Sequence, residues 1–140
     1  MTARPDYSTE AEILGDRLRA WGPAAGWAIV LFVLSALPHL GRAPSFPFSD
    51  KVAHMILYAV LGATLAWGWS RSPRPVPHLM VLLAGVLYGL SDEWHQMYVP
   101  GRVPDLADWL ADVVGLLVGY RATLQLVERV HGNVEAEEAT

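Results

Sequence analysis

The chain has 140 residues, enough for one domain, and 53% of them are hydrophobic while only 17% are charged. With a mean hydropathy of +0.28, this composition is apolar for a soluble domain of this size and typical of a small integral membrane protein. The net charge is −4, and the lack of cysteine excludes disulfides and thiolate chemistry.

Residues 1–20 are polar and of mixed charge. Thr9 and Glu12 have the spacing of a capping box, and an apolar stripe follows them. A short interfacial helix and a solvated cytoplasmic tail explain this segment equally well. No positively charged start leads directly into a short apolar core with a clear cleavage site, so we expect no cleaved signal peptide.

Four apolar segments follow, each near the roughly 20 residues that a membrane-spanning helix needs. They cover about 23–40, 50–69, 79–98 and 105–126. Loops rich in proline separate them, and the acidic residues after Val130 are expected to be disordered. We predict an all-α polytopic membrane protein, a bundle of four transmembrane helices at 21–127, between an N-terminal tail or interfacial helix at 1–20 and an acidic tail at 128–140.

The distribution of Lys and Arg predicts the orientation. Seven of these residues flank the side that holds both termini, and three lie in the two other loops. We therefore expect both termini in the cytoplasm, and the inner membrane of a bacterial cell as the location.

Polar residues form a stripe on each of three helices. On the second helix, Asp50, His54 and Tyr58 are spaced i, i+4, i+8 and share one face, and Lys51 lies beside them. Because lipid cannot satisfy such groups, the three stripes should face one another. They predict a polar pocket that opens to the outer face of the membrane.

The third and fourth helices carry the other two stripes. The third ends with Asp92, Glu93, His95 and Gln96, and the fourth begins with Asp105, Asp108 and Asp112. Arg102 lies in the turn between them. Simpler roles remain open for some of these residues: helix capping for Asp50 and Asp105, packing for Tyr58, and an exposed turn for Arg102.

The same residues carry a family resemblance. The motif residues are Asp50, Lys51, His54, Tyr58, Gly89, Asp92, Glu93, His95, Gln96, Pro100, Gly101, Arg102, Asp105, Asp108, Gly115 and Gly119. This set resembles the VanZ-like family over about residues 28–120. The resemblance implies a small multi-pass bacterial membrane protein, and one family member is linked to teicoplanin resistance. The family usually has Asn where this chain has Asp112, so a role transferred to that position is in doubt.

Three functions fit this pattern. The first is a membrane-embedded hydrolase or transferase that acts on a lipid-linked cell-envelope molecule. Its catalytic residues would be His54, Asp92, Glu93, His95 and Asp108. Its substrate-binding residues would be Asp50, Lys51, Tyr58, Gln96, Arg102, Asp105 and Asp112. His with an adjacent carboxylate suits general acid–base catalysis, and Arg and Lys suit phosphate or carboxylate binding.

The second function is a non-catalytic protein that binds a lipid or a wall precursor in the same pocket. The third is a proton-coupled small transporter, which the nearly charge-free cytoplasmic half of the spans argues against. No spacing is a recognised metal signature, so we expect no cofactor, although His and carboxylates suit several divalent ions. The expected partners are the bilayer and a membrane lipid or lipid-linked wall precursor, and no nucleic acid.

Overall fold

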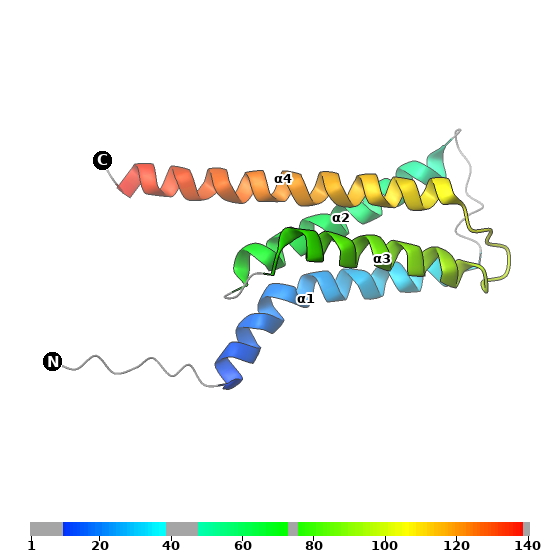
Figure 1. The fold of residues 1–140 in the computed structure, drawn as a ribbon, viewed down its shortest axis with the longest axis horizontal. Coiled ribbons are helices and arrows are strands. Elements are labelled where there is room, and N and C mark those ends of the chain that lie inside the picture. The colour runs from blue at the N-terminus through cyan, green and yellow to red at the C-terminus, as the bar shows by residue number, and fades with distance from the viewer. Residues whose placement is uncertain (1–9, 39–47, 73–75, 139–140) are drawn as a thin grey trace.

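The computed structural model describes residues 10–38, 48–72 and 76–138. Four helices follow one another in this part of the chain: α1 (Glu10–Ser35), α2 (Ser49–Arg71), α3 (His78–Gln96) and α4 (Leu106–Glu138) (Figure 1). No strand occurs among the described residues, so the all-α prediction is confirmed for them. The loop expected between the first two spans lies mostly outside the described residues.

α1 begins well before the predicted first span. It starts at Glu10 and continues through Pro23, so the described part of the N-terminal segment is helical rather than a solvated tail. A proline inside a helix removes one hydrogen bond and clashes with the carbonyl four residues earlier, which bends the helix. Accordingly, the N-terminal part of α1 turns away from the bundle in Figure 1.

α4 differs most from its predicted bounds. It begins directly after Asp105, as expected, but it continues to Glu138 without a break. The disorder expected after Val130 is therefore wrong for the described residues. Extending an existing helix adds one hydrogen bond per residue without a new nucleation cost, and the Glu and Ala residues of this segment are good helix formers.

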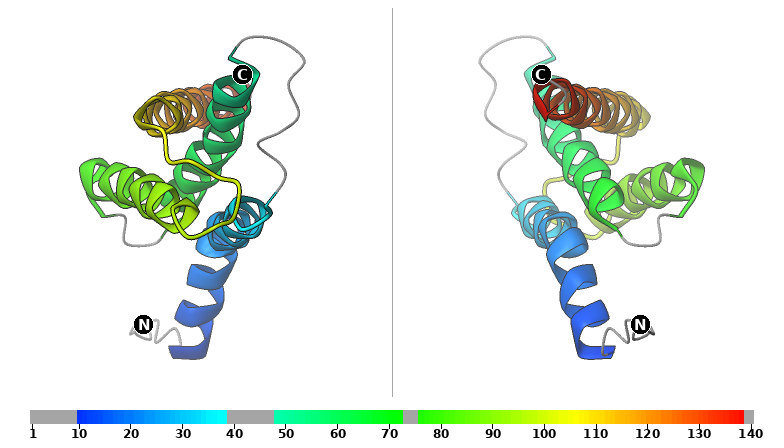
Figure 2. Two further views of the ribbon diagram at one scale, coloured as in Figure 1. Left: turned by 90° about the vertical axis from the view of Figure 1, so that its right-hand side faces the viewer. Right: turned by 90° about the vertical axis from the view of Figure 1, so that its left-hand side faces the viewer.

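α2 lies at the centre of the bundle and contacts the three other helices, α4 most extensively (Figure 2). Side-chain hydrogen bonds to backbone carbonyls join α1 to its neighbours. Trp27 Nε1 donates to the carbonyl of Leu57 at 2.9 Å, and the Tyr88 hydroxyl donates to that of Ala28 at 2.6 Å. The first of these bonds gives the indole N–H of Trp27 an acceptor inside the bundle.

Three glycines allow the backbones of α2 and α4 to touch. A Cβ atom at Gly119 would overlap the carbonyl of Ala59, and one at Gly115 would overlap the carbonyl of Met55. On the other helix, a Cβ atom at Gly62 would overlap a carbonyl of α4. Small residues four apart permit such close approach between membrane helices. The contacts advance in the same direction along both helices, so α2 and α4 run parallel.

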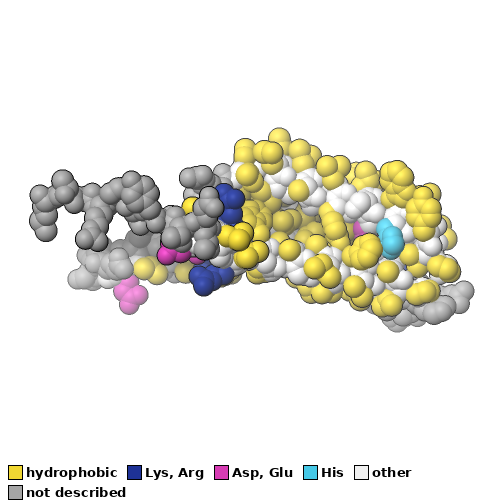
Figure 3. All heavy atoms as spheres, turned by 90° about the horizontal axis from the view of Figure 1, so that it is seen from below, with side chains coloured by type: hydrophobic (Ala, Val, Ile, Leu, Met, Phe, Trp, Pro, Cys, Tyr) yellow, Lys and Arg dark blue, Asp and Glu magenta, His cyan; other side chains and the backbone are white. Residues whose placement is uncertain are grey.

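The outer surface of the bundle is apolar. Figure 3 shows one face covered with hydrophobic side chains, and the Lys and Arg side chains visible there gather toward one end. α1, α2 and α4 are each long and apolar enough to cross a membrane. α3, with 19 residues, is not among them, since its last turns hold the polar residues Ser91–Gln96. Such an exposed apolar surface is typical of an integral membrane protein.

Candidate functional site

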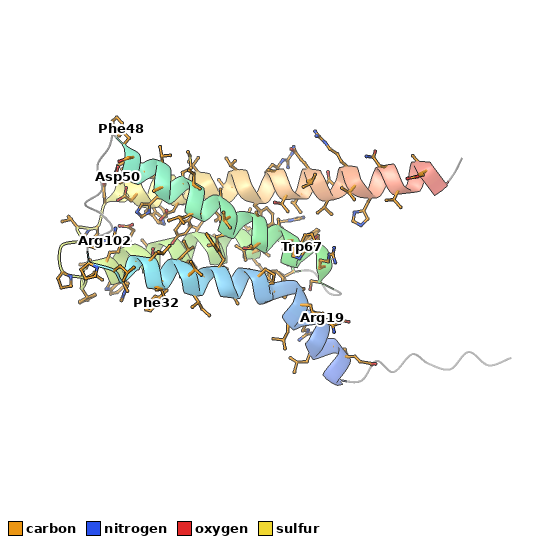
Figure 4. All side chains as sticks on the ribbon, turned by 180° about the vertical axis from the view of Figure 1, so that it is seen from behind. Arg19, Phe32, Phe48, Asp50, Trp67 and Arg102 are labelled. Carbon is orange, nitrogen blue, oxygen red and sulfur yellow. The ribbon has the colours of Figure 1, made fainter. Side chains whose placement is uncertain are left out.

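The predicted site residues gather at one end of the bundle, where α2 and α4 begin and α3 ends. Asp50 and Arg102, both labelled in Figure 4, lie at this end, while Arg19 and Trp67 lie toward the other. The parallel run of α2 and α4 produces this arrangement, because it places the first turns of both helices side by side.

Lys51 is surrounded by three carboxylates. Its Nζ donates to Asp108 Oδ1 at 2.6 Å, to Asp105 Oδ2 at 2.8 Å and to Asp50 Oδ2 at 2.9 Å. The hydrogen bond from Lys51 lowers the pKa of the Asp105 carboxyl, so this group stays ionised at neutral pH. Since an ammonium group has three N–H donors, Lys51 has none left for a substrate. It joins the start of α2 to the start of α4.

His54 lies one turn further along α2, and its ring contacts carboxylates of α4. Its Nδ1 is 2.9 Å from Asp112 Oδ1, and its Nε2 is 3.9 Å from Asp108 Oδ2. The Asp112 side chain is 1% exposed, so this contact lies within the bundle. A carboxylate on one ring nitrogen fixes the tautomer and orientation of the imidazole.

Tyr58 extends the polar face of α2 one turn deeper. Its hydroxyl lies 3.5 Å from Asp92 Oδ2 on α3, a long hydrogen bond between two buried residues. Gln96, one turn later on α3, is also buried. The polar stripes of α2 and α3 therefore face each other here, as the sequence predicted.

Glu93 connects α3 to the start of α4. Its Oε2 accepts the backbone N–H of Asp105 at 3.1 Å, and Asp105 Oδ1 accepts the N–H of Ala107 at 2.9 Å. Asp105 therefore caps α4 and also binds Lys51. Asp50 does not cap α2, because that helix has Phe48 at its N-cap position and no side-chain cap.

A cavity of about 290 Å³ lies beside this cluster, between α1, α2 and the end of α3. The residues that line it include Leu31, Leu34, Ser35, His54, Leu57, Tyr58, Gln96 and Arg102. Arg102 Nη2 donates to the carbonyl of Leu34 at 3.3 Å, which holds the turn after α3 against the end of α1. The lining therefore combines leucine side chains of α1 and α2 with an imidazole, a phenol, a guanidinium and, from Asp50, a carboxylate.

Sequence reasoning missed the contribution of α1 to this cavity. Leu31 and Leu34 sit in an apolar run that only Ser35 interrupts, and this serine is the one signal in the sequence. In the structure Ser35 is buried.

His95 lies apart from the hydrogen-bonded cluster. Its ring packs against Phe32 of α1, with 4.7 Å between the ring centroids. Its Nε2 is buried and has no hydrogen-bond partner among the described residues. Of the two histidines predicted to be catalytic, the structure places His54 in direct contact with carboxylates of α4.

A larger hollow of about 830 Å³ occurs on the surface of α3 and α4, and it contains none of the predicted site residues. Its lining is mostly apolar, with His78 Nδ1 and the Tyr120 hydroxyl hydrogen-bonded at 2.8 Å. Lipid chains suit such a surface, so we place the functional site at the polar cluster.

The cluster has the groups needed for proton transfer and for ion binding. An imidazole that contacts carboxylates can take up or release a proton near neutral pH. In addition, His54, Glu93 and Asp112 each offer a metal-ligand atom, and these atoms lie within 4.8 Å of one another.

Comparisons with known proteins agree with the resemblance noted in the sequence. A protein of Schizosaccharomyces pombe, described only as uncharacterized, is 36% identical over 89 residues. This match covers 62% of the present chain and 54% of the relative, so it spans about half the relative's length. No solved structure matches the chain. The model of the VanZ/LLP1 family matches residues 17–127, which include every residue of the cluster. With the family pattern extending over all four helices and the site, the chain belongs to the VanZ/LLP1 family.

Proposed function

We propose that this protein is a membrane-embedded enzyme that acts on the polar head group of a lipid-linked cell-envelope molecule. In this proposal all four helices cross the inner membrane of a bacterial cell, both termini are cytoplasmic, and the cluster opens to the outer face. The observation that carries it is the position of the His54–Asp112 pair beside a cavity that both leucine and polar side chains line.

The size and lining of the cavity support a lipid head group as the ligand. At about 290 Å³ it is at the small end of the range for ligand pockets, so it suits a head group rather than a whole lipid. The leucine side chains in its lining suit the first carbons of an acyl or prenyl chain. Arg102 Nε is buried and lacks a hydrogen-bond partner in the described structure, which leaves a donor for phosphate.

The structure changes the role that we give to one of the two cations. Lys51, expected from the sequence to bind substrate, is saturated by carboxylates and instead positions α4 against α2. Arg102 is then the cation that holds the phosphate or carboxylate of the substrate. His54 acts as the general base that takes a proton from water or an acceptor hydroxyl, and Asp112 orients it.

Purified protein in detergent tests this proposal. We expect turnover of phospholipids or lipid-linked wall precursors, with the head-group product detected by mass spectrometry. His54→Ala should abolish it while His131→Ala, an exposed histidine near the end of α4, should not. His95→Ala should lower it less than His54→Ala does. Helical circular dichroism of each variant shows whether folding is kept.

Two results would redirect the proposal. Saturable lipid binding without any product from the wild-type protein would indicate the non-catalytic binding protein. Equal turnover by His54→Ala and wild type would remove His54 from the mechanism.

A cellular test follows from the link between one family member and teicoplanin resistance. Expression of the chain should raise the teicoplanin concentration that inhibits a sensitive host.

A further inference from the structure

We propose that His54, Glu93 and Asp112 form a binding site for a divalent metal ion of the Zn²⁺ or Mn²⁺ type. The three residues come from α2, α3 and α4, and their ligand atoms lie within 4.8 Å of one another. Two ligands of one tetrahedral ion lie about 3.4 Å apart for bonds of roughly 2.1 Å. The three atoms therefore have to approach one another by up to roughly an ångström, which small side-chain rotations supply.

Two unpartnered oxygens support the site. Glu93 Oε1 and Asp112 Oδ2 are buried and have no hydrogen-bond partner among the described residues. Their residues are only 6% and 1% exposed, so water does not satisfy these atoms freely. A buried carboxylate oxygen without a partner is costly, and a bound cation removes that cost.

The second oxygen of each carboxylate is already held. Glu93 Oε2 accepts the backbone N–H of Asp105, and Asp112 Oδ1 contacts His54 Nδ1. Each side chain is thus fixed by one atom while another stays free. Ligands in protein metal sites are commonly oriented by outer hydrogen bonds in this way.

The charges of the cluster favour a cation. Lys51 is shared by three carboxylates, and in the described part of the chain no Lys or Arg forms an ion pair with Asp92, Glu93 or Asp112. Buried carboxylates close to one another repel unless a positive charge or a proton intervenes. A divalent ion supplies two positive charges at the point where these groups meet.

The donor set narrows the choice of ion. One imidazole nitrogen with carboxylate oxygens suits Zn²⁺ and Mn²⁺ better than Ca²⁺, which takes six to eight oxygens. A further carboxylate oxygen is close to these three ligands, because Asp108 Oδ2 lies 3.9 Å from His54 Nε2. The other oxygen of Asp108, Oδ1, accepts a hydrogen bond from Lys51. The inference does not depend on the proposed reaction, because ion binding is measured without any substrate. A bound ion would take the place of His54 as the group that activates water, with His54 as one of its ligands.

The test is a titration of the purified wild-type chain in detergent, after tag removal and treatment with EDTA. Isothermal calorimetry with ZnCl₂ and MnCl₂ should show saturable binding of about one ion per chain, together with a higher Tm. MgCl₂ and CaCl₂ should bind more weakly. Glu93→Gln and His54→Ala should each weaken binding by about tenfold or more. Asp16→Asn, a matched change at an exposed carboxylate of α1, should bind as wild type does.

Two outcomes overturn the proposal. One is the absence of saturable Zn²⁺ or Mn²⁺ binding by folded wild-type protein, which would mean that protons neutralise the cluster. The other is equal binding by Glu93→Gln, His54→Ala and Asp16→Asn. The wild-type titration decides the question even where a variant at a buried position fails to fold.

Discussion

His54 of α2 and Asp112 of α4 are held 2.9 Å apart, Nδ1 to Oδ1, at a depth where the Asp112 side chain is 1% exposed. Loss of either partner leaves the other buried without its hydrogen bond, which costs about 1–3 kcal/mol. The double variant His54→Ala/Asp112→Ala should therefore be more stable than the sum of the single effects implies. We expect a coupling of about 0.5–3 kcal/mol from unfolding curves in detergent. Additive single effects would show that the two residues do not interact.

Lys51→Met should destabilise the protein strongly. Removing one partner of a buried ion pair costs about 3–5 kcal/mol, and because Lys51 is 24% exposed we expect a loss of about 2–3 kcal/mol. Arg19→Met is the matched control. Arg19 pairs with Asp16 at 3.6 Å on the exposed part of α1, where such a pair is worth about 0–1 kcal/mol. Equal losses in thermal unfolding would argue against the central role of Lys51.

The contact of Lys51 with Asp105 should also make the stability of the folded protein depend on pH. Because the folded state lowers the pKa of Asp105, this contact stabilises the protein above the unfolded pKa of about 3.9 and is lost as the pH falls through the folded value. Lys51→Met should lack this part of the acid destabilisation, which unfolding curves at several acidic pH values would detect.

Gly119→Ala should destabilise the bundle although alanine favours helix. The new Cβ atom would overlap the backbone of α2 at Ala59, and overpacking of this kind costs about 1–3 kcal/mol. Gly132→Ala in the same helix meets no neighbour within 4 Å and should raise stability by about 0.5–1 kcal/mol. Thermal unfolding of the two variants compares them directly, and a stable Gly119→Ala protein would contradict the close contact.

The proposed orientation predicts which sites are reached from outside the cell. The chain has no cysteine, so a single introduced cysteine is the one thiol that a maleimide can label in each variant. A membrane-impermeant maleimide should label Val103→Cys, an exposed position before α4, in intact cells. It should label Gly132→Cys, near the end of α4, only after the cells are opened. The reverse pattern would place the cluster on the cytoplasmic side.

Helical periodicity predicted most of the cluster, because the polar residues on each helix repeat at the spacing of one face. It placed His54 and Tyr58 on a common face, and they do contact Asp112 and Asp92. It did not predict the three carboxylate partners of Lys51. The direction of a flexible side chain beside the stripe depends on which helix packs there, and spacing within α2 carries no such information.

The positions of α1 and of His95 show the same limit. His95 belongs to the polar face of α3 by spacing, but its ring lies on Phe32, because α1 packs beside the end of α3. The packing of α2 on α4 was within reach of the sequence, since Gly115 and Gly119 have the four-residue spacing of a close helix contact. α4 is longer than predicted because an acidic composition, which is typical of disorder, does not end a helix that has already formed.

The carboxylates that surround Lys51 and contact His54 have a consequence for how the protein is made. Apart from Asp50, these acids belong to residues 105–112, which leave the ribosome after α2 and α3. Until then Asp50 is the only one of these partners that has been made, and it lies next to Lys51 on the same helix. The contacts that join the start of α2 to the start of α4 therefore form after synthesis of the last helix has begun, so the order of synthesis puts the assembly of the cluster at the end of biogenesis.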